Sequence, residues 1–449
     1  MTVFRAYDIR GIYPSELDED LAEKIAKAFG TFLPEGATVA VGGDVRVSTP
    51  ALKERVIAAL LSTGANVIDV GMVATPMVYY YVSSQGLDGG IVVTASHSPK
   101  EYNGIKLVGK GGVCLSWETG ISQIKEIAEG DEFREGDGGL EQRGIEDAFI
   151  RHALGHVTVD GRKKVVIDAA NGACSLVAPK LFARLGWEVV PLFCTPDGRF
   201  PNHEADPIKK KNLAHLQQRV RETKADLGVS YDADGDRLGV VNDRGEIVEN
   251  NVIFSLFAQE ALRKRPGAAV VYEVVVSKAV EDTIIRCGGR AVLSRVGHSY
   301  IQSALIQQKA ALAGENSGHY YFPENYGYDD ALFASLKVAE LLNAGPLSAR
   351  QREIATYLTS EEFRPPCPDQ RKFTVVADLQ QRLAAAGYQV NTLDGARVIL
   401  ERGWFIIRAS NTGPQLVVRW EAQDQAAFAE IGRLVEETLA GAGVPLHGA

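Results

Sequence analysis

The feature that most constrains the fold is an internal repeat between residues 38 and 320. The same order of strand, helix, strand, helix and strand is predicted three times, with apolar first strands at 38–41, 164–168 and 269–273. Glycines such as Gly64 and Gly288 follow helical patterns and can end them. Alternating strands and helices favour sheets with parallel strands and right-handed crossovers. A repeat of this kind predicts three similar α/β domains.

Each repeat ends in a polar loop that follows an apolar strand. The first loop is 94–106, the second is 232–237 and the third is 314–319. Ligand sites in α/β folds lie at the carboxyl ends of strands. We therefore expect the three loops to occupy corresponding places and to face one cleft.

The last part of the chain has a different pattern. Residues 365–369, which contain three prolines, are predicted to form a linker. A helix near 376–386, strands at 397–401, 404–409 and 415–420, and a helix near 425–439 should follow. The predicted fold is therefore three similar α/β domains with mixed, mainly parallel sheets, plus a smaller C-terminal α+β domain, around a central cleft. The expected domains span 1–145, 146–248, 249–362 and 363–449.

The bulk composition excludes several classes of protein. The net charge of −9 argues against a nucleic-acid partner. No apolar run approaches the roughly 20 residues of a membrane-spanning helix, and the N-terminus has no signal-peptide core. The five cysteines are scattered and form no CxxC pair, which favours reduced thiols and a cytoplasmic location.

Three aspartates in the second loop predict a metal site. Asp232, Asp234 and Asp236 alternate, so an extended segment would place them on one face. Their mutual repulsion calls for a cation, and hard oxygen ligands favour Mg²⁺ or Ca²⁺. An EF-hand is excluded because Arg237 stands where that loop needs glycine and a strand pattern resumes at Leu238.

The first loop contains a candidate nucleophile, Ser96, but no familiar hydrolase motif. The sequence around it lacks the GxSxG form of a nucleophile elbow. Residues 104–111 nearly match a phosphate-binding Walker loop, yet Gly111 replaces the required Ser or Thr, and the middle is apolar. Taken alone, Ser96 could be a helix cap and Lys106 a solvated side chain.

Five segments together resemble one family. They are residues 4–11 (FRAYDIRG), 94–99 (TASHSP), 232–237 (DADGDR), 314–319 (GENSGH) and 408–412 (RASNT). In this order they resemble the α-D-phosphohexomutase superfamily, most closely its bacterial phosphomannomutase/phosphoglucomutase branch. The resemblance covers essentially the whole chain.

The resemblance implies a reacting end of the cleft. Ser96 matches the serine that carries a phosphoryl group. Asp232, Asp234 and Asp236 would hold Mg²⁺, with a phosphoserine oxygen from Ser96 as a further ligand. Arg237 would stabilise the transferring group, and Lys106 and His319 match the general acid/base candidates.

The resemblance also implies substrate-binding residues. Glu315 and Ser317 match the pair that reads the 3- and 4-hydroxyls of the sugar. The loop that grips the non-reacting phosphate corresponds to Arg408, Ser410, Asn411 and Thr412. Further positions beside the ligand correspond to Tyr7, Arg10 and His298.

The implied activity is interconversion of hexose 6-phosphate and hexose 1-phosphate, of mannose and/or glucose. A hexose 1,6-bisphosphate would be the intermediate and activator, Mg²⁺ the cofactor, and a phosphosugar the only expected partner of a monomer or homodimer. Alternatives are a phosphoglucosamine mutase, a Mg²⁺-dependent sugar phosphatase or a non-catalytic phosphosugar-binding protein. Glucosamine members tend to have Gln where this chain has Asn316, which favours hexoses.

Two positions depart from the family pattern. Ser98 replaces the usual Asn after Ser-His, a conservative change. The third domain often offers Asp-Val-Lys at a strand end, but residues 273–275 here are Glu-Val-Val. Lys278, three places further on, is the candidate substitute for the absent lysine.

Overall fold

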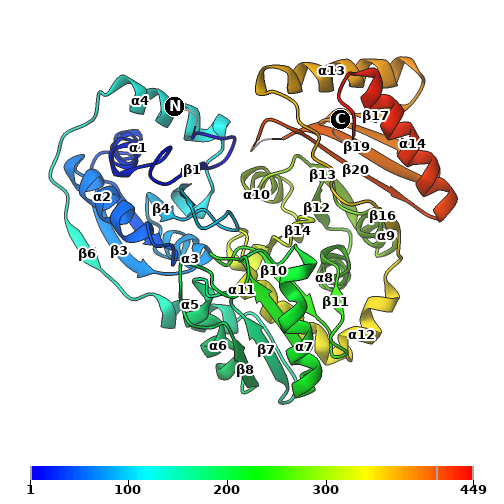
Figure 1. The fold of residues 1–449 in the computed structure, drawn as a ribbon. Coiled ribbons are helices and arrows are strands. Elements are labelled where there is room, and N and C mark those ends of the chain that lie inside the picture. Colours follow the sequence, from blue (N-terminus) through cyan, green and yellow to red (C-terminus); the bar gives the residue numbers. More distant parts are fainter. Residues whose placement is uncertain (1–2, 411–412, 447–449) are drawn as a thin grey trace.

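A computed structural model describes residues 3–410 and 413–446. It has four sheets, and each belongs to one domain along the chain. Figure 1 shows the domains as an open arc, with the first domain (blue) and the fourth (orange to red) facing each other across its mouth. The predicted fold class is confirmed: three α/β domains are followed by a smaller domain with an antiparallel sheet.

The first domain is built on a six-stranded mixed sheet in the order β1-β5-β4-β2-β3-β6. Its strands are β1 (Ile9–Ile12), β2 (Thr38–Gly43), β3 (Asn66–Met72), β4 (Gly89–Val93), β5 (Tyr102–Gly109) and β6 (Leu140–Gln142). Its helices are α1 (Glu19–Phe32), α2 (Thr49–Ser62), α3 (Thr75–Gln85) and α4 (Ser122–Gly130). The Walker-like segment lies mostly in strand β5, as its apolar pattern predicts.

The second domain repeats the design with a five-stranded sheet in the order β11-β10-β9-β7-β8. Its elements are α5 (Glu146–Leu154), β7 (Lys164–Asp168), α6 (Cys174–Arg184), β8 (Glu188–Leu192), α7 (Ala214–Thr223), β9 (Leu227–Tyr231), β10 (Leu238–Val241) and β11 (Ile247–Val248). Helix α7 is directly preceded by a separate 3₁₀ turn, Lys210–Leu213.

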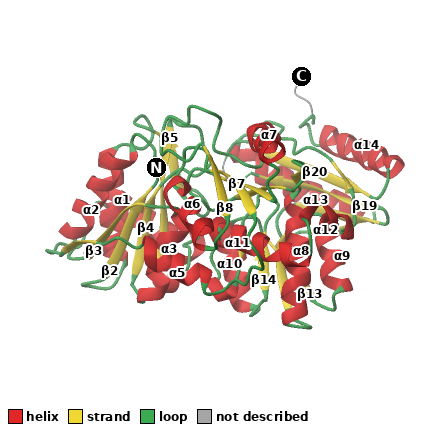
Figure 2. Ribbon diagram, turned by 90° about the horizontal axis from the view of Figure 1, so that it is seen from below, coloured by secondary structure: helices red, strands yellow, loops and turns green. Residues whose placement is uncertain are grey.

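The third domain has a four-stranded sheet in the order β13-β12-β14-β15. Its elements are α8 (Asn250–Lys264), β12 (Ala269–Glu273), α9 (Lys278–Arg286), β13 (Arg290–Ser294), α10 (His298–Gln307), β14 (Leu312–Gly314), β15 (Tyr320–Tyr321), α11 (Ala331–Leu341) and α12 (Leu347–Arg350). Strands β13, β12 and β14 are parallel. Figure 2 shows helices on both sides of the sheets in these domains.

The fourth domain is an antiparallel sheet covered by two helices. Its elements are β16 (Leu358–Thr359), α13 (Asp369–Ala385), β17 (Gln389–Asn391), β18 (Ala396–Leu400), β19 (Gly403–Ala409), β20 (Leu416–Ala422) and α14 (Gln425–Gly441). The proline-rich segment is not a free linker, because Phe363 bridges to Val418 in strand β20 and Pro366 bridges to Gln415 directly before that strand. Prolines suit this position since an edge segment need not donate every backbone hydrogen bond.

The apolar cores show how the domains are joined. One continuous cluster extends from Ala40 in the first domain to Ile354 at the end of the third. The fourth domain has its own core, between its sheet and helices α13 and α14. It meets the third domain through a small cluster of Val274, Val275, Trp404 and Ile406. None of the helices in the described residues is both long enough and apolar enough to span a membrane.

A buried ion pair in the second domain should make stability depend on pH. His203 Nε2 lies 3.0 Å from Asp168 Oδ2. Burial lowers the pKa of His203, but the hydrogen bond and charge of Asp168 outweigh burial, so the pKa is raised. The stabilisation is therefore complete below the unfolded-state pKa of about 6.5 and is lost as pH rises through the higher folded-state pKa.

Urea unfolding of the wild type and His203→Gln should give a larger difference in unfolding free energy at pH 6 than at pH 8.5. Equal differences at both values would contradict this origin.

Candidate active site

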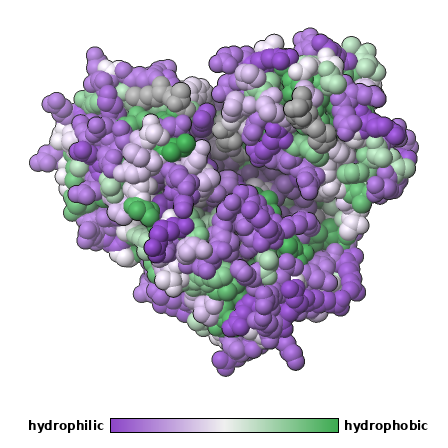
Figure 3. Space-filling model, viewed as in Figure 1, coloured by the Kyte–Doolittle hydropathy of each residue, from purple (hydrophilic) through white to green (hydrophobic). Residues whose placement is uncertain are grey.

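All four domains contribute to one central cleft. Its volume is about 1140 Å³, and its lining includes Tyr7 and Ser96 from the first domain, Arg237 from the second, Glu315 from the third and Arg408 from the fourth. Figure 3 shows the molecule hollowed at its centre, below the notch between the first and fourth domains. The three loops of the repeat therefore face the same space, as the sequence predicts.

Ser96 lies directly after strand β4 and is held in an unusual backbone conformation. Its φ is 48°, in the left-handed region that a non-glycine residue rarely adopts. The Ser96 N–H donates to Thr94 Oγ1 at 2.9 Å, and the Ser96 hydroxyl donates to Asp232 Oδ2 at 2.7 Å. The first loop and the second loop therefore meet at the hydroxyl oxygen of Ser96.

The three aspartates of the second loop converge, but through a turn. The predicted extended segment is wrong, because residues 232–236 bend at Gly235, whose φ is 79°. Asp232 Oδ1 accepts the backbone N–H groups of Gly235, Asp236 and Arg237 at 3.0, 3.1 and 3.2 Å. Each aspartate offers one carboxylate oxygen to a group whose atoms all lie within 4.8 Å of one another.

The charge of the aspartates fits a bound cation. Asp232, Asp234 and Asp236 are 0–2% exposed, and Asp234 Oδ1 has no hydrogen-bond partner among the described residues. Burial and the charges of Asp236 and Asp234 raise the pKa of Asp232 well above its usual value. A set of hard oxygen ligands, one of them buried without a donor, suits a divalent metal ion.

Lys106, on strand β5, forms ion pairs with two of the three aspartates. Its Nζ donates to Asp234 Oδ2 at 2.8 Å and also to Asp236 Oδ2. Burial lowers the pKa of Lys106, but the two aspartates outweigh it and raise the pKa well above the usual value. Burial likewise raises the pKa of Asp236, but Lys106 and His319 outweigh it, so that pKa is well below its usual value. One ammonium group balances only part of the charge of three carboxylates.

The third loop brings His319 to the same cluster. His319 Nε2 lies 3.2 Å from Asp236 Oδ1, and Nδ1 lies 2.6 Å from Ser317 Oγ. Burial lowers the pKa of His319, but the charges of Glu315 and Asp236 outweigh it and raise the pKa. Glu315 Oε1 accepts the hydroxyl of Tyr321, which fixes the carboxylate at the cleft wall.

The N-terminal segment and helix α10 close another side of the cleft. Arg10 donates from Nη2 to Asp8 at 2.7 Å and from Nη1 to Ser98 Oγ at 2.9 Å. The ring of Tyr7 packs edge-on against His298, with centroids 5.1 Å apart. Burial, with the charge of Lys106, lowers the pKa of His298 to about 3, so this imidazole is neutral at pH 7.

The fourth domain provides a second cationic region in the cleft. Arg408, at the end of strand β19, is buried, and its Nη2 lies 3.1 Å from Asp394 Oδ2. Lys372 Nζ donates to the backbone oxygens of Ser410 and Gly413 at 2.6 and 3.1 Å. Arg408 and Ser410 both line the cleft. The predicted positions Asn411 and Thr412 lie outside the described residues.

Three further cations, Arg237, Lys278 and Arg419, differ in their relation to the cleft. Arg237 lines it, with Nη1 3.8 Å from Asp206 Oδ1 and no hydrogen-bond partner for Nε among the described side chains. Lys278, proposed as the substitute for the absent lysine, instead turns its ammonium group to Asp282 on the same helix. The expectation that Lys278 reaches the sugar is therefore not supported. Arg419, from strand β20, lines the cleft and lies 3.4 Å from the backbone oxygen of Val275.

Two buried acids beside the cluster were missed at the level of sequence. Asp329 is 1% exposed, and neither of its carboxylate oxygens has a hydrogen-bond partner in the described chain. Burial and the charge of Asp236 raise its pKa to about 7. Burial and the charge of Glu315 raise the pKa of Glu273 to about 8. No local signal pointed to Asp329: Asp330 accepts the Phe333 N–H as the N-cap of helix α11, so the Asp329-Asp330 pair reads as an ordinary helix start.

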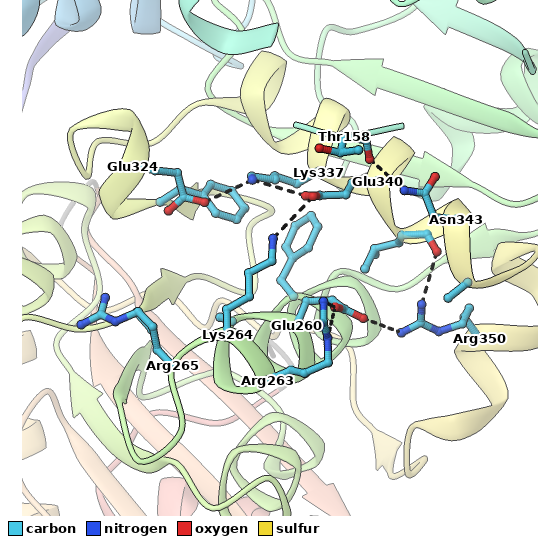
Figure 4. A pocket seen from close by; sticks show the side chains of 16 residues that line it. Thr158, Glu260, Arg263, Lys264, Arg265, Glu324, Lys337, Glu340, Asn343 and Arg350 are labelled. Carbon is cyan, nitrogen blue, oxygen red and sulfur yellow. Dashed lines mark hydrogen bonds and ion pairs between the residues drawn. The ribbon is translucent and has the colours of Figure 1, made fainter. Parts of the chain in front are cut away.

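A second cavity, of about 530 Å³, lies at the other end of helix α8 (Figure 4). Its lining contains five cations and three carboxylates, and each cation has a partner among neighbouring residues. Arg263 and Arg350 pair with Glu260, and Lys264 and Lys337 pair with Glu340. Arg265 donates to the backbone oxygens of Lys309 and Ala310.

Comparison with known proteins accounts for this arrangement of four domains around one cleft. Models of the phosphoglucomutase/phosphomannomutase family match the chain in sequence order: alpha/beta/alpha domain I at residues 1–135, domain II at 147–245, domain III at 249–357 and the C-terminal domain at 362–437. The chain belongs to this family. The predicted resemblance is thereby confirmed, and the protein is an enzyme of the isomerase class.

Relatives in the phosphoglucomutase/phosphomannomutase family match along nearly their whole length. A phosphomannomutase/phosphoglucomutase of Pseudomonas putida is 38% identical over 96% of this chain and 94% of its own. A phosphoglucomutase of Neisseria meningitidis is 37% identical over 96% of this chain and 95% of its own. The crystal structure of a family protein from Burkholderia thailandensis superimposes with a TM-score of 0.92 at 35% identity, covering 98% and 97% of the two chains.

Proposed function

We propose that this protein interconverts hexose 6-phosphate and hexose 1-phosphate, with mannose and/or glucose as the sugar. The observation that carries the proposal is the position of the Ser96 hydroxyl, 2.7 Å from Asp232 in a buried carboxylate cluster, at the wall of a cleft that also contains Arg408. A mutase needs a group that carries phosphate and a second site that holds the phosphate already on the sugar. Ser96 and the Arg408 loop supply these two functions.

Ser96 would begin each cycle as a phosphoserine and give its phosphoryl group to the free hydroxyl of the bound hexose monophosphate. The resulting hexose 1,6-bisphosphate would turn over within the cleft and return its other phosphoryl group to Ser96. Magnesium, when held by Asp232, Asp234 and Asp236 with an oxygen of phospho-Ser96, would neutralise charge on the transferring group. Arg237 would add a second positive charge there.

Proton transfer and sugar recognition would fall to other residues. Lys106 and His319 are the general acid/base candidates, since both contact Asp236 beside Ser96. The raised pKa of Lys106 keeps its ammonium group protonated at neutral pH, which is the form that a proton donor requires, while it also holds that proton more tightly. Glu315 and Ser317 would bind the 3- and 4-hydroxyls. The non-reacting phosphate and the rest of the ligand would be held by Tyr7, Arg10, His298, Arg408, Ser410, Asn411 and Thr412.

Specificity between mannose and glucose should be weak. The two sugars differ at the 2-hydroxyl, whereas Glu315 and Ser317 are assigned to the 3- and 4-hydroxyls. We expect kcat/KM values for mannose 1-phosphate and glucose 1-phosphate within about ten-fold of each other. Paired steady-state kinetics, with glucose 1,6-bisphosphate as activator and Mg²⁺ present, measure this ratio. Turnover of only one hexose would contradict it, and a preference for glucosamine 1-phosphate would favour the phosphoglucosamine mutase alternative.

The mutase proposal also has to be separated from a sugar phosphatase. A mutase conserves phosphate on the sugar, whereas a phosphatase releases it to water. Measuring inorganic phosphate in the same reactions distinguishes the two, because stoichiometric release would overturn the proposal.

We also propose a cytoplasmic monomer or homodimer that binds neither nucleic acid nor membrane.

A further inference from the structure

A buried ion pair lies beneath the Ser96 loop. Asp44 and Arg46 follow strand β2, and both side chains are 0% exposed. Arg46 Nε donates to Asp44 Oδ2 at 3.1 Å, and the Arg46 backbone N–H donates to Asp44 Oδ1 at 2.9 Å. A fully buried ion pair is costly unless every remaining donor and acceptor is satisfied. The partners of these groups therefore indicate what the pair does.

The guanidinium of Arg46 binds the backbone of the Ser96 loop. Nη2 donates to the carbonyl oxygens of Ser96 and Ser98, each at 2.6 Å. Nη1 donates to those of Pro99 and Tyr102 at 2.7 and 2.9 Å. A guanidinium has five N–H donors. With the bond to Asp44, the five donors meet five acceptors, and four of these belong to residues 96–102.

Asp44 reaches the same loop from the other side. Its Oδ2 accepts the hydroxyl of Thr94 at 2.8 Å, and Thr94 Oγ1 in turn accepts the Ser96 N–H at 2.9 Å. The carbonyl and the N–H of Ser96 are therefore both tied, directly or through one hydroxyl, to the Asp44–Arg46 pair. This accounts for the left-handed φ of Ser96, since a strained conformation persists only where its surroundings determine it.

The second domain covers the pair. The ring of Phe200 lies over the Arg46 guanidinium, with 5.4 Å between the guanidinium carbon and the ring centroid. Gly198 packs against the backbone of 45–47 so closely that a Cβ there would lie 2.2 Å from Val45 O. The loop that contains Ser96 and the domain that contains the aspartates are thus in contact through Arg46 as well as through Ser96 itself.

We propose that Arg46, oriented by Asp44, is a positioning residue for phosphoryl transfer. It fixes the backbone of 96–102 so that the Ser96 oxygen stays at the aspartate cluster in every state of the cycle. The inference rests on the proposed function for its catalytic consequence, but not for its effect on the loop. Lysine cannot replace this arginine, because an ammonium group has three donors that do not form a planar fork.

The test compares Arg46→Lys with Arg134→Lys. Arg134 is a matched control, because its guanidinium also donates to backbone carbonyls of the first domain, at Gly30, Leu33 and Thr63, away from the cleft. In Arg46→Lys we expect both kcat and the rate of Ser96 phosphorylation by glucose 1,6-bisphosphate to fall at least about ten-fold. The loss should reach roughly 100-fold if the Ser96 oxygen is displaced by about 1 Å. KM for glucose 1-phosphate should change less than about three-fold, because the groups that bind sugar and distal phosphate are untouched. Arg134→Lys should keep the phosphorylation rate and kcat.

A second readout does not depend on turnover. Hydrogen exchange of the amides in 96–102 should accelerate in Arg46→Lys and remain unchanged in Arg134→Lys. If folded Arg46→Lys exchanged and phosphorylated like the wild type, the proposal would be overturned. If Arg46→Lys were insoluble, Thr94→Val would replace it, because this variant removes the link from Asp44 to the Ser96 N–H. The same two measurements, hydrogen exchange of 96–102 and the rate of Ser96 phosphorylation, would then decide. A wild-type protein that never became phosphorylated would refute the proposed mutase. The hydrogen-exchange comparison would still test whether Arg46 fixes the backbone of residues 96–102.

Discussion

The Ser96→Ala variant should lose mutase activity by at least about 10⁴-fold, because the alanine has no oxygen to carry the phosphoryl group. Neither glucose 1-phosphate nor mannose 1-phosphate should be turned over measurably. Intact-mass analysis should show the roughly 80 Da phosphate increment on wild-type protein treated with glucose 1,6-bisphosphate and none on the variant. Folding should be preserved, because the substitution removes only the hydrogen bonds of the Ser96 hydroxyl to Asp232 and to the adjacent His97 ring.

The matched control is Ser98→Ala, two residues further along the same loop. The Ser98 hydroxyl accepts a hydrogen bond from Arg10 and lies at the cleft wall, but it is not the predicted phosphate carrier. This variant should still gain the phosphate increment and should retain activity within about ten-fold of the wild type. Turnover in Ser96→Ala at a rate near that of Ser98→Ala would rule out a phosphoserine mechanism. Phosphate release that is independent of Ser96 would indicate a phosphatase instead.

The sequence predicts those parts of the site that lie at strand ends. The apolar runs before Thr94, Asp232 and Gly314 mark strands β4, β9 and β14, and each polar loop follows one of them into the cleft. The repeat of these units then places the loops together without any knowledge of distances. Ser96, Lys106, the aspartates and His319 could therefore be assembled from local pattern and the family resemblance alone.

Residues whose role depends on long-range contacts carry no comparable signal. Arg46 reads as an ordinary charged residue after a strand, and its role depends on carbonyl groups 50 to 56 positions away. Asp329 is buried where the start of helix α11 meets the second loop, through the hydrogen bond from Ala331 N–H to Gly235 O, and local pattern does not reveal this contact. The path of the Asp232–Asp236 segment was mispredicted for a different, local reason, since Gly235 permits a turn that period-two alternation does not anticipate.

The cleft buries several carboxylates close together, and some of their oxygens have no hydrogen-bond partner among the described residues. Lys106 shares its charge between Asp234 and Asp236, while Asp329 and Glu273 remain buried with free carboxylate oxygens. Raised pKa values at Asp329 and Glu273 relieve part of the repulsion by favouring the protonated form. Within the aspartate turn, Lys106 and His319 hold the pKa of Asp236 well below its usual value, whereas burial and the neighbouring carboxylates raise the pKa of Asp232. The strongest negative potential is thus expected at the aspartate turn.

Asp234→Asn tests that potential through both metal binding and catalysis. Asp234 Oδ2 accepts hydrogen bonds from the Thr75 hydroxyl at 2.7 Å and from Lys106 Nζ at 2.8 Å. Asp234 Oδ1 is buried and has no donor among the described residues. Replacing the carboxylate by an amide removes one charge and places a donor among oxygen ligands, so the site should lose affinity for Mg²⁺. We expect kcat/KM to fall roughly 100-fold or more. Thermal unfolding should show a smaller Mg²⁺-dependent rise in Tm than for the wild type, because stabilisation by a ligand follows its affinity for the folded state.

Asp243→Asn is the matched control for the loss of one carboxylate. Asp243 belongs to the same domain and accepts the N–H and hydroxyl of Ser348 at 3.0 and 2.8 Å, outside the aspartate cluster. It should retain the full Mg²⁺-dependent shift in Tm and near-normal activity. In EDTA, which removes the metal, the unfolding free energy of Asp234→Asn should be at most about 1 kcal/mol lower than that of the wild type. The variant loses attraction to Lys106, but it also relieves repulsion from Asp232 and Asp236. An unchanged Mg²⁺ response in Asp234→Asn would exclude Asp234 as a ligand and would move the metal site to the neighbouring group of Asp236, His319 and Asp329.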